Sequence, residues 1–173
     1  TDMVNWTDHG VVASLKYFKW LTEDNGAWAA QCINRNGKFY LYCPMPGGVG
    51  IGVLVSDSPY GPFTDPIGKA LINNGPQDID PTILIDDDTR LPDGQGQAYL
   101  YWGNPELWYV KLNKDMISYS GEIMKKPDLV KVKDEKDPFH YQEGPWAWKR
   151  NGHYYMAYAS TCCPEGIGYA MSD

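Results

Sequence analysis

Two acidic residues in this chain stand where a general acid and a supporting carboxylate could act. Glu143 directly precedes Gly-Pro-Trp in HYQEGPWAWKRNGHYYMAY, and Asp80 opens an apolar strand in PQDIDPTILIDDD. A carboxyl partly desolvated beside Tyr141, Trp146 or Trp148 favours its protonated form and could deliver a proton to a leaving group. Taken singly, each motif also fits a structural role: Glu143 as a solvated turn residue and Asp80 as a strand-start cap.

An internal repeat gives the two carboxylates equivalent places. RNGKFYLY at 35–42 returns as RNGHYYMAY at 150–158, GIGVLVSD at 50–57 returns as GIGYAMSD at 166–173, and GQAYLYWG at 96–103 lies between them. A period near 50 residues with several strands per unit is typical of propeller blades. The sequence therefore predicts an all-β chain, a single incomplete β-propeller domain of about three blades. The blade-like units span about 26–65, 78–120 and 141–173.

Each unit reads as a hairpin, with a short apolar strand, a polar turn and an alternating aromatic strand. The apolar strands are expected at 28–33, 82–85 and 145–148. Asn36-Gly37 and Asn151-Gly152 are strong two-residue turn signals, because Asn and Gly both accept positive φ. Helical signals are confined to a short turn at 14–20, which supports the all-β prediction.

The amino-acid composition limits the classes of binding partner that we expect. Twenty-two acidic against fifteen basic side chains give a net charge of −7, without a Lys/Arg cluster that could neutralise a phosphate backbone, so nucleic acid is not an expected partner. No apolar run approaches the roughly 20 residues that a membrane-spanning helix needs, so no membrane partner is expected. Seven Trp and thirteen Tyr suit sugar-binding clefts as well as β cores. The cellular compartment stays open.

Several weaker motifs favour structural roles. Asp86, Asp87, Asp88 and Asp93 lack the spacing of an EF-hand calcium loop and are interpreted as a solvated hairpin loop. His140, three residues before Glu143, is interpreted as a surface-loop residue. The cysteines are interpreted as buried or half-buried thiols rather than a disulfide scaffold; they are Cys32, Cys43, Cys162 and Cys163.

Three motifs together, IDPTILIDDD…AYLYWGN, QEGPWAWKRNGHYYMAY and NGAWAAQCINRNGKFYLY, resemble glycoside hydrolase family 43. These enzymes are five-bladed propellers that act on arabinose- and xylose-containing glycans. The resemblance covers nearly the whole chain, from the second blade to most of the fourth. It implies that Glu143 is the general acid and Asp80 the pKa modulator. It also implies inversion at the anomeric carbon, with acid and base ~6.5–9.5 Å apart to admit a water.

The resemblance extends to substrate contacts and ions. It implies that Trp28 lines the sugar subsite, although a core Trp at a blade start fits equally well. Trp102 and Asn104 come at the end of the aromatic strand and could reach the pocket. We expect Trp102 and Ile79 to contact substrate and Asn104 to be structural. The resemblance implies no cofactor for the reaction, although a structural calcium or sodium ion would fit the complete propeller. The expected partner is a carbohydrate substrate.

The general base has no match in the chain, because neither Asp2 nor Asp8 heads a strand-turn-strand unit. We therefore expect these residues to hold the acid half of the machinery, and the isolated chain to be inactive. Two alternatives remain open at this point. One is a non-catalytic carbohydrate-binding propeller fragment, and the other is a chain that self-associates through open blade edges.

Overall fold

A computed structural model describes residues 4–22, 26–126, 140–161 and 165–172. Two short 3-10 helices, η1 (Leu15–Tyr17) and η2 (Pro46–Gly48), are the helical elements of this part of the chain. Its strands are β1 (Gln31–Arg35), β2 (Lys38–Pro44), β3 (Ile51–Ser56), β4 (Thr82–Arg90), β5 (Gly96–Trp102), β6 (Trp108–Leu112), β7 (Tyr119–Lys125), β8 (Tyr141–Arg150), β9 (His153–Ser160) and β10 (Ile167–Ser172).

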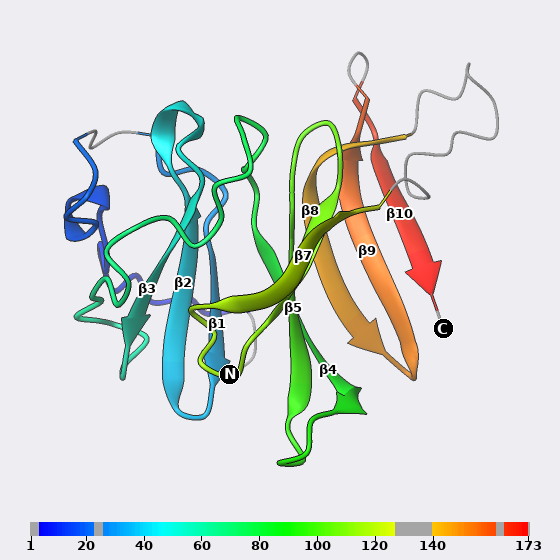
Figure 1. Cartoon of the computed structure of the whole chain (residues 1–173), viewed down its shortest axis with the longest axis horizontal. Helices are drawn as coiled ribbons and strands as arrows, with labels where there is room; N and C mark the ends of the chain where they lie inside the picture. Colours follow the sequence, from blue (N-terminus) through cyan, green and yellow to red (C-terminus); the bar gives the residue numbers. More distant parts are fainter. Residues whose placement is uncertain (1–3, 23–25, 127–139, 162–164, 173) are drawn as a thin grey trace.

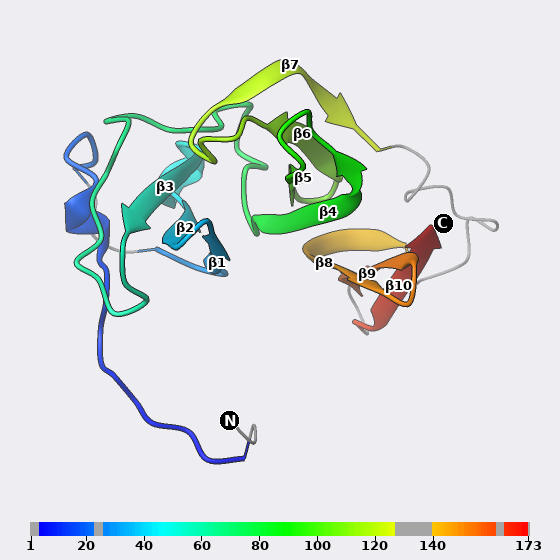
Figure 2. The ribbon, with the colours of Figure 1, turned by 90° about the horizontal axis from the view of Figure 1, so that it is seen from below.

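The strands form three antiparallel sheets, ordered β1-β2-β3, β4-β5-β6-β7 and β8-β9-β10. Sequential strands are neighbours throughout, as expected for up-and-down blades. Figures 1 and 2 show the sheets side by side along an arc, with β1, β4 and β8 on its inner side. This arrangement confirms the predicted all-β, incomplete propeller.

The two Asn-Gly hairpin turns form as the sequence predicts. Asn36 and Gly37 have φ of 53° and 77°, and Asn151 and Gly152 have φ of 52° and 81°. Positive φ at both central residues is the geometry that matches the twist of the flanking strands. The turns set the register of the first and third sheets, because Arg35 pairs with Lys38 and Arg150 with His153.

Apolar side chains fill the spaces between neighbouring sheets. The first and second sheets share the larger cluster, which includes Tyr42, Val53, Ile83 and Leu100. The Tyr42 hydroxyl donates to the Met116 carbonyl at 2.6 Å and ties β2 to the turn after β6. A smaller cluster around Leu107, Tyr141, Ala147, Met156 and Tyr158 joins the second and third sheets.

Thr82, the first residue of β4, links the inner strands of all three sheets. Its Oγ1 accepts hydrogen bonds from Gln31 Nε2 on β1 at 3.2 Å and from the Ala147 amide on β8 at 3.4 Å. Gln31 Oε1 in turn accepts from the Ile83 amide at 2.5 Å. These bonds join backbone and side chains that are buried, so the starts of β1 and β4 are held close to each other and to the second half of β8.

Strand boundaries differ from the sequence prediction in all three sheets. β1 spans Gln31–Arg35 instead of 28–33, and β4 continues to Arg90 instead of ending at 85. β8 begins at Tyr141, before the expected start at Pro145, so Glu143 lies within the strand instead of ahead of it. Bulges on both sides of Glu143 let the strand run through Glu-Gly-Pro, where a regular ladder would need the missing proline N–H. The second sheet also gains a fourth strand, β7, with a bulge against β6.

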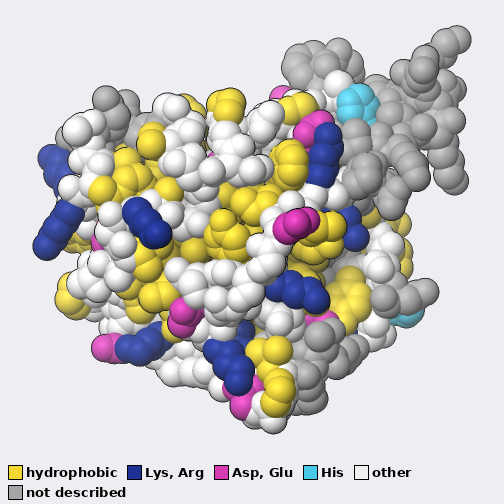
Figure 3. Space-filling model, in the orientation of Figure 1, with side chains coloured by type: hydrophobic (Ala, Val, Ile, Leu, Met, Phe, Trp, Pro, Cys, Tyr) yellow, Lys and Arg dark blue, Asp and Glu magenta, His cyan; other side chains and the backbone are white. Residues whose placement is uncertain are grey.

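Charged side chains of both signs are interspersed on the surface. On the face in Figure 3, Lys and Arg side chains are scattered and several lie beside Asp or Glu. Exposed ion pairs include Lys38 with Asp57 at 2.6 Å and Lys114 with Asp93 at 2.8 Å. None of the helices in the described ranges has the length and apolar character needed to cross a membrane.

Candidate active site

Asp80 lies two residues before β4 and reaches across to the third sheet. Its backbone has φ of 56°, a left-handed conformation that Asp adopts more readily than most residues. From there Oδ2 accepts a hydrogen bond from the Gly144 amide at 2.9 Å. Asp80 therefore contacts the backbone immediately after Glu143, although 64 residues separate Asp80 from Gly144 along the chain.

The bulges in β8 make this contact feasible. Glu143 pairs with Ala159, and the next paired residue of β8 is Trp146, opposite Ala157. Gly144 has φ of 62°, which glycine adopts at no steric cost. Its amide therefore donates to Asp80 rather than to the ladder. The half-buried Glu143 is brought beside Asp80 at the junction of the second and third sheets.

Asn104, which the sequence analysis expected to be structural, contacts Glu143 directly. Its Nδ2 donates to Glu143 Oε2 at 2.5 Å, and its Oδ1 accepts from Gln142 Nε2 at 3.1 Å. One sequence signal could have found it: β5 runs antiparallel to β4, so a residue just past the end of β5 must lie level with Asp80 just before β4.

Burial and charge act together on Asp80. Desolvation raises the pKa of its carboxyl, the negative charge of Glu143 raises this pKa further, and the hydrogen bond from Gly144 opposes both effects. Tyr141, the first residue of β8, is fully buried and donates its hydroxyl to the Gly103 carbonyl at 2.6 Å. Burial raises the pKa of Tyr141 as well, so Tyr141 remains a neutral donor.

Asp80→Asn should raise the thermal unfolding midpoint of the 173-residue chain at neutral pH. Since the pKa of Asp80 is higher in the folded chain than in the unfolded chain, its ionisation lowers the free energy of unfolding as the pH rises. Asn keeps an acceptor for Gly144 and tolerates positive φ. The difference in midpoint from the unmodified chain should close below about pH 3, where both states are protonated.

Calorimetry from acid to neutral pH measures this difference. Asp57→Asn is the matched control, because Asp57 is exposed and its surface ion pair with Lys38 contributes little. An Asp80→Asn midpoint below that of the unmodified chain at neutral pH, or a difference independent of pH, would contradict the prediction.

The three predicted substrate contacts differ in placement. Trp102 is fully buried, and its indole N–H donates to Asp78 Oδ1 at 2.7 Å. The prediction that Trp102 contacts substrate is therefore wrong, because β5 lies between β4 and β6 and this ring packs in the core. Ile79 is half-buried, and its carbonyl accepts from the Gly103 amide at 3.0 Å. Trp28 is 73% exposed ahead of β1, so its ring is open to a ligand.

Asp86 lies within β4 and is buried, so it does not belong to the solvated loop that the sequence predicts. It accepts from the Tyr154 hydroxyl at 2.5 Å and lies 3.5 Å from Lys149 Nζ. Asp93 is exposed and pairs with Lys114. Across the described ranges, no group of three or more His, Cys, Asp or Glu side chains could hold a metal ion.

His140 and the cysteines, which the sequence analysis interpreted as structural, differ in how well the structure agrees with that interpretation. His140 hydrogen-bonds through Nε2 to Thr161 Oγ1 at 2.6 Å and is half-buried, so it is more enclosed than a surface-loop residue. Cys43 is buried, as predicted, and burial raises the pKa of its thiol to about 11. Cys32 is exposed, contrary to the prediction, because its side chain points outward from β1. Cys162 and Cys163 lie outside the described residues.

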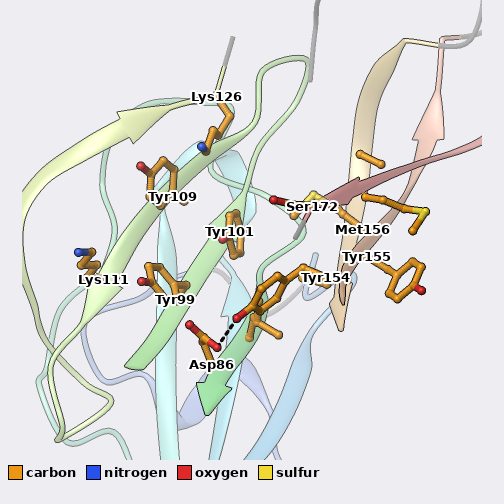
Figure 4. Close-up of a pocket in the computed structure, with 14 residues that line it drawn as sticks. Asp86, Tyr99, Tyr101, Tyr109, Lys111, Lys126, Tyr154, Tyr155, Met156 and Ser172 are labelled. Carbon is orange, nitrogen blue, oxygen red and sulfur yellow. Dashed lines mark hydrogen bonds between the residues drawn. The ribbon is translucent and has the colours of Figure 1, made fainter. Parts of the chain in front are cut away.

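A cavity of about 740 Å³ opens between the second and third sheets, away from Asp80 and Glu143. Figure 4 shows tyrosines of β5 and β6 facing Tyr154 of β9, whose hydroxyl points to Asp86. Burial and the neighbouring tyrosines raise the pKa of Tyr101 to about 12, so its hydroxyl stays protonated. Because its lining includes neither Asp80 nor Glu143, this cavity is separate from the candidate active site.

Comparison with known proteins places the chain in a family. The family model for glycosyl hydrolases family 43 matches residues 1–172. The chain belongs to glycosyl hydrolase family 43. A curated relative, an arabinoxylan arabinofuranohydrolase of Paenibacillus polymyxa, is 34% identical and is matched over 100% of this chain and 31% of its own length.

Solved structures of family 43 proteins share the fold. An α-L-arabinofuranosidase from Clostridium thermocellum aligns with a TM-score of 0.75 and 38% identity over 100% of this chain and 56% of its own. A Xanthomonas citri family 43 enzyme, solved with xylotriose, aligns with a TM-score of 0.77 and 26% identity over 96% of this chain and 57% of its own. This family 43 chain thus spans little more than half the length of these structures.

Proposed function

We propose that the protein containing this chain hydrolyses glycosidic bonds in arabinose- or xylose-containing plant cell-wall glycans, with inversion at the anomeric carbon. Glu143 is the general acid and Asp80 the carboxylate that positions it. The observation that supports this best is the contact between Asp80 Oδ2 and the Gly144 amide, which brings carboxylates of neighbouring inner strands together. The relatives named above carry arabinofuranosidase and arabinofuranohydrolase names, in keeping with this substrate class.

The two carboxylates have different tasks in this reaction. The Glu143 O–H protonates the glycosidic oxygen, the bond from that oxygen to the anomeric carbon breaks, and its electron pair stays on the departing sugar. Asp80 accepts a hydrogen bond from the Gly144 amide. This bond fixes the backbone next to Glu143 and so orients the Glu143 side chain. Burial and the negative charge of Glu143 raise the pKa of Asp80, so Asp80 takes up a proton more readily than an exposed carboxyl does.

Water attacks the opposite face of the sugar ring and loses its proton to a general base. Asp8, in the N-terminal segment, is exposed and accepts a hydrogen bond from the Gly10 amide at 2.7 Å. It heads no strand-turn-strand unit, and we propose that the base is supplied by residues outside these 173. Trp28, exposed ahead of β1, is the proposed aromatic contact for a sugar ring, and Ile79 an apolar contact beside Asp80.

Activity measurements test this assignment directly. We expect the 173-residue chain to release no 4-nitrophenol above background from the aryl α-L-arabinofuranoside or β-D-xyloside, because water activation is missing. A version extended at both ends to the length of its relatives should turn over at least one of them. Robust turnover by the short chain would contradict the assignment of the base. A folded, extended version that cleaves neither substrate nor arabinoxylan would contradict the function.

A further inference from the structure

Asn104 is the hydrogen-bond donor to the proposed acid. Its Nδ2 lies 2.5 Å from Glu143 Oε2, and both side chains are half-buried. Among the residues that the structure describes, no second hydrogen-bond donor to the Glu143 carboxyl is found. The two oxygens of this carboxyl are therefore unequal, because Oε2 is occupied by a donor and Oε1 is left for other partners.

The orientation of the Asn104 amide follows from its second contact. Gln142 Nε2 donates to Asn104 Oδ1 at 3.1 Å. If the Asn104 amide were flipped, its NH₂ group would face the NH₂ group of Gln142 and its oxygen would face the Glu143 carboxylate. Both contacts would be repulsive. Glu143 and Gln142, adjacent on β8, thus fix Asn104 with its donor toward the acid.

The backbone around Asn104 is anchored to both halves of the site. The Gly103 amide donates to the Ile79 carbonyl at 3.0 Å, next to Asp80. The Gly103 carbonyl accepts from the buried Tyr141 hydroxyl at 2.6 Å. Asn104 therefore follows a residue that is bonded to the segments carrying Asp80 and Glu143, and it can hold the acid without being on either strand.

We propose that Asn104 is a positioning residue that places the acidic proton of Glu143 on Oε1; this inference presupposes the proposed function. A carboxamide N–H only donates, so the Glu143 oxygen it faces must act as an acceptor. In the neutral acid, Oε2 is then the carbonyl oxygen and Oε1 carries the single O–H. Oε1 is consequently the atom that protonates the glycosidic oxygen.

The contact also strengthens as the reaction proceeds. When the proton leaves Oε1 for the glycosidic oxygen, Glu143 becomes a carboxylate and the hydrogen bond from Asn104 becomes charge-assisted. An interaction that is stronger in the transition state than in the ground state accelerates the chemical step. The benefit should be largest for leaving groups that depend on protonation.

Leaving-group dependence in the extended protein tests this role. Asn104→Leu keeps the number and branching of the side-chain heavy atoms and removes the donor. A hydrogen bond is worth ~0.5–1.5 kcal/mol between neutral groups and ~1.5–3 kcal/mol to a charged group. Since only the difference of ~1–1.5 kcal/mol acts on kcat, kcat for phenyl α-L-arabinofuranoside should fall by about 5- to 15-fold. With 2,4-dinitrophenolate, which leaves without protonation, kcat should stay within about threefold, and KM should change little for either substrate. Asn34→Leu makes the same substitution at an exposed position of β1 and should leave both substrates unaffected.

The outcomes separate this inference from the proposed function. If the extended protein hydrolyses none of these substrates, the proposed function is wrong. If Glu143→Gln keeps full activity on the phenyl substrate, the assignment of Glu143 as the general acid is wrong. The positioning role is wrong if Glu143→Gln loses activity on the phenyl substrate while Asn104→Leu keeps it. It is also wrong if Asn104→Leu lowers kcat by the same factor on the phenyl and the 2,4-dinitrophenyl substrates. Should Asn104→Leu fail to fold, as judged by circular dichroism, Asn104→Ala removes the donor without adding bulk or charge, and its results are interpreted in the same way.

Discussion

Glu143→Gln in the extended protein is expected to lower kcat on phenyl α-L-arabinofuranoside by about 10²- to 10⁴-fold, the range that a positioned general acid contributes. Gln keeps the shape of the side chain and can still meet the Asn104 amide through its own carbonyl oxygen. It has no acidic proton to deliver. The backbone contact between Gly144 and Asp80 does not involve the Glu143 side chain, so the site should remain assembled.

Steady-state kinetics with leaving groups of increasing acidity measure the effect. The loss should shrink on the 2,4-dinitrophenyl substrate, because that leaving group departs unprotonated. Glu122→Gln is the matched control, since Glu122 is exposed on β7 and far along the sheet from the site. Its kcat should stay within about twofold of the unmodified protein, as for a surface substitution away from special features.

Binding measurements decide between catalysis and simple recognition. Titration calorimetry with xylotriose or an arabinoxylan oligosaccharide should show that Glu143→Gln still binds sugar. If the unmodified extended protein binds the same sugars with no hydrolysis of any substrate, the chain is part of a carbohydrate-binding propeller. Equal turnover by the Gln variant and the unmodified protein would remove Glu143 from the mechanism.

Trp102→Ala is expected to lower the free energy of unfolding of the 173-residue chain by about 3–5 kcal/mol, as for other large aromatic truncations in cores. Trp102 is fully buried, and its indole N–H bonds Asp78, which is 1% exposed. Asp78 Oδ2 also accepts the Asn74 amide at 2.5 Å and the Gly75 amide at 3.0 Å. Truncation thus leaves a cavity and removes one of the donors that compensate a buried carboxylate.

Trp102→Phe separates the hydrogen bond from the cavity. Phe retains most of the ring, but leaves Asp78 Oδ1 without its donor, which should cost about 1–3 kcal/mol. Trp108→Phe is the matched comparison, because the buried Trp108 indole N–H has no hydrogen-bond partner among the described residues. Urea unfolding measures both changes, and a Trp108→Phe loss equal to that of Trp102→Phe would show that the Asp78 contact is unimportant.

The repeat in the sequence carried most of the fold prediction. Because Asn36-Gly37 and Asn151-Gly152 specify tight turns by their own backbone preferences, the hairpins around them could be predicted without knowledge of the rest of the chain. The same repeat put Asp80 and Glu143 in equivalent units. The start of β8 could not be predicted from the sequence, since the bulge at Glu-Gly-Pro depends on how this strand pairs with β9.

Trp102 and Asn104 show where sequence reasoning could not decide. Trp102 ends the aromatic strand β5 and Asn104 lies two residues beyond, and their residue types fit a sugar cleft or a core equally well. The structure buries Trp102 against Asp78 and turns Asn104 toward Glu143. Side chains two residues apart on a strand share a face, but Gly103 has φ of 126° and the chain has left β5, so the alternation no longer applies at Asn104.

By itself, the sequence determined the all-β class, the repeated hairpins and the Asn-Gly turns, and it placed two carboxylates near the inner strands, because these depend on neighbouring residues and on periodicity. The tertiary structure alone decided which groups meet. Asp80 meets Gly144 across 64 residues, and Asn104 meets Glu143 across 39. Such contacts are set by how whole sheets pack and by where a bulge frees a single amide, and no local pattern of residues encodes either.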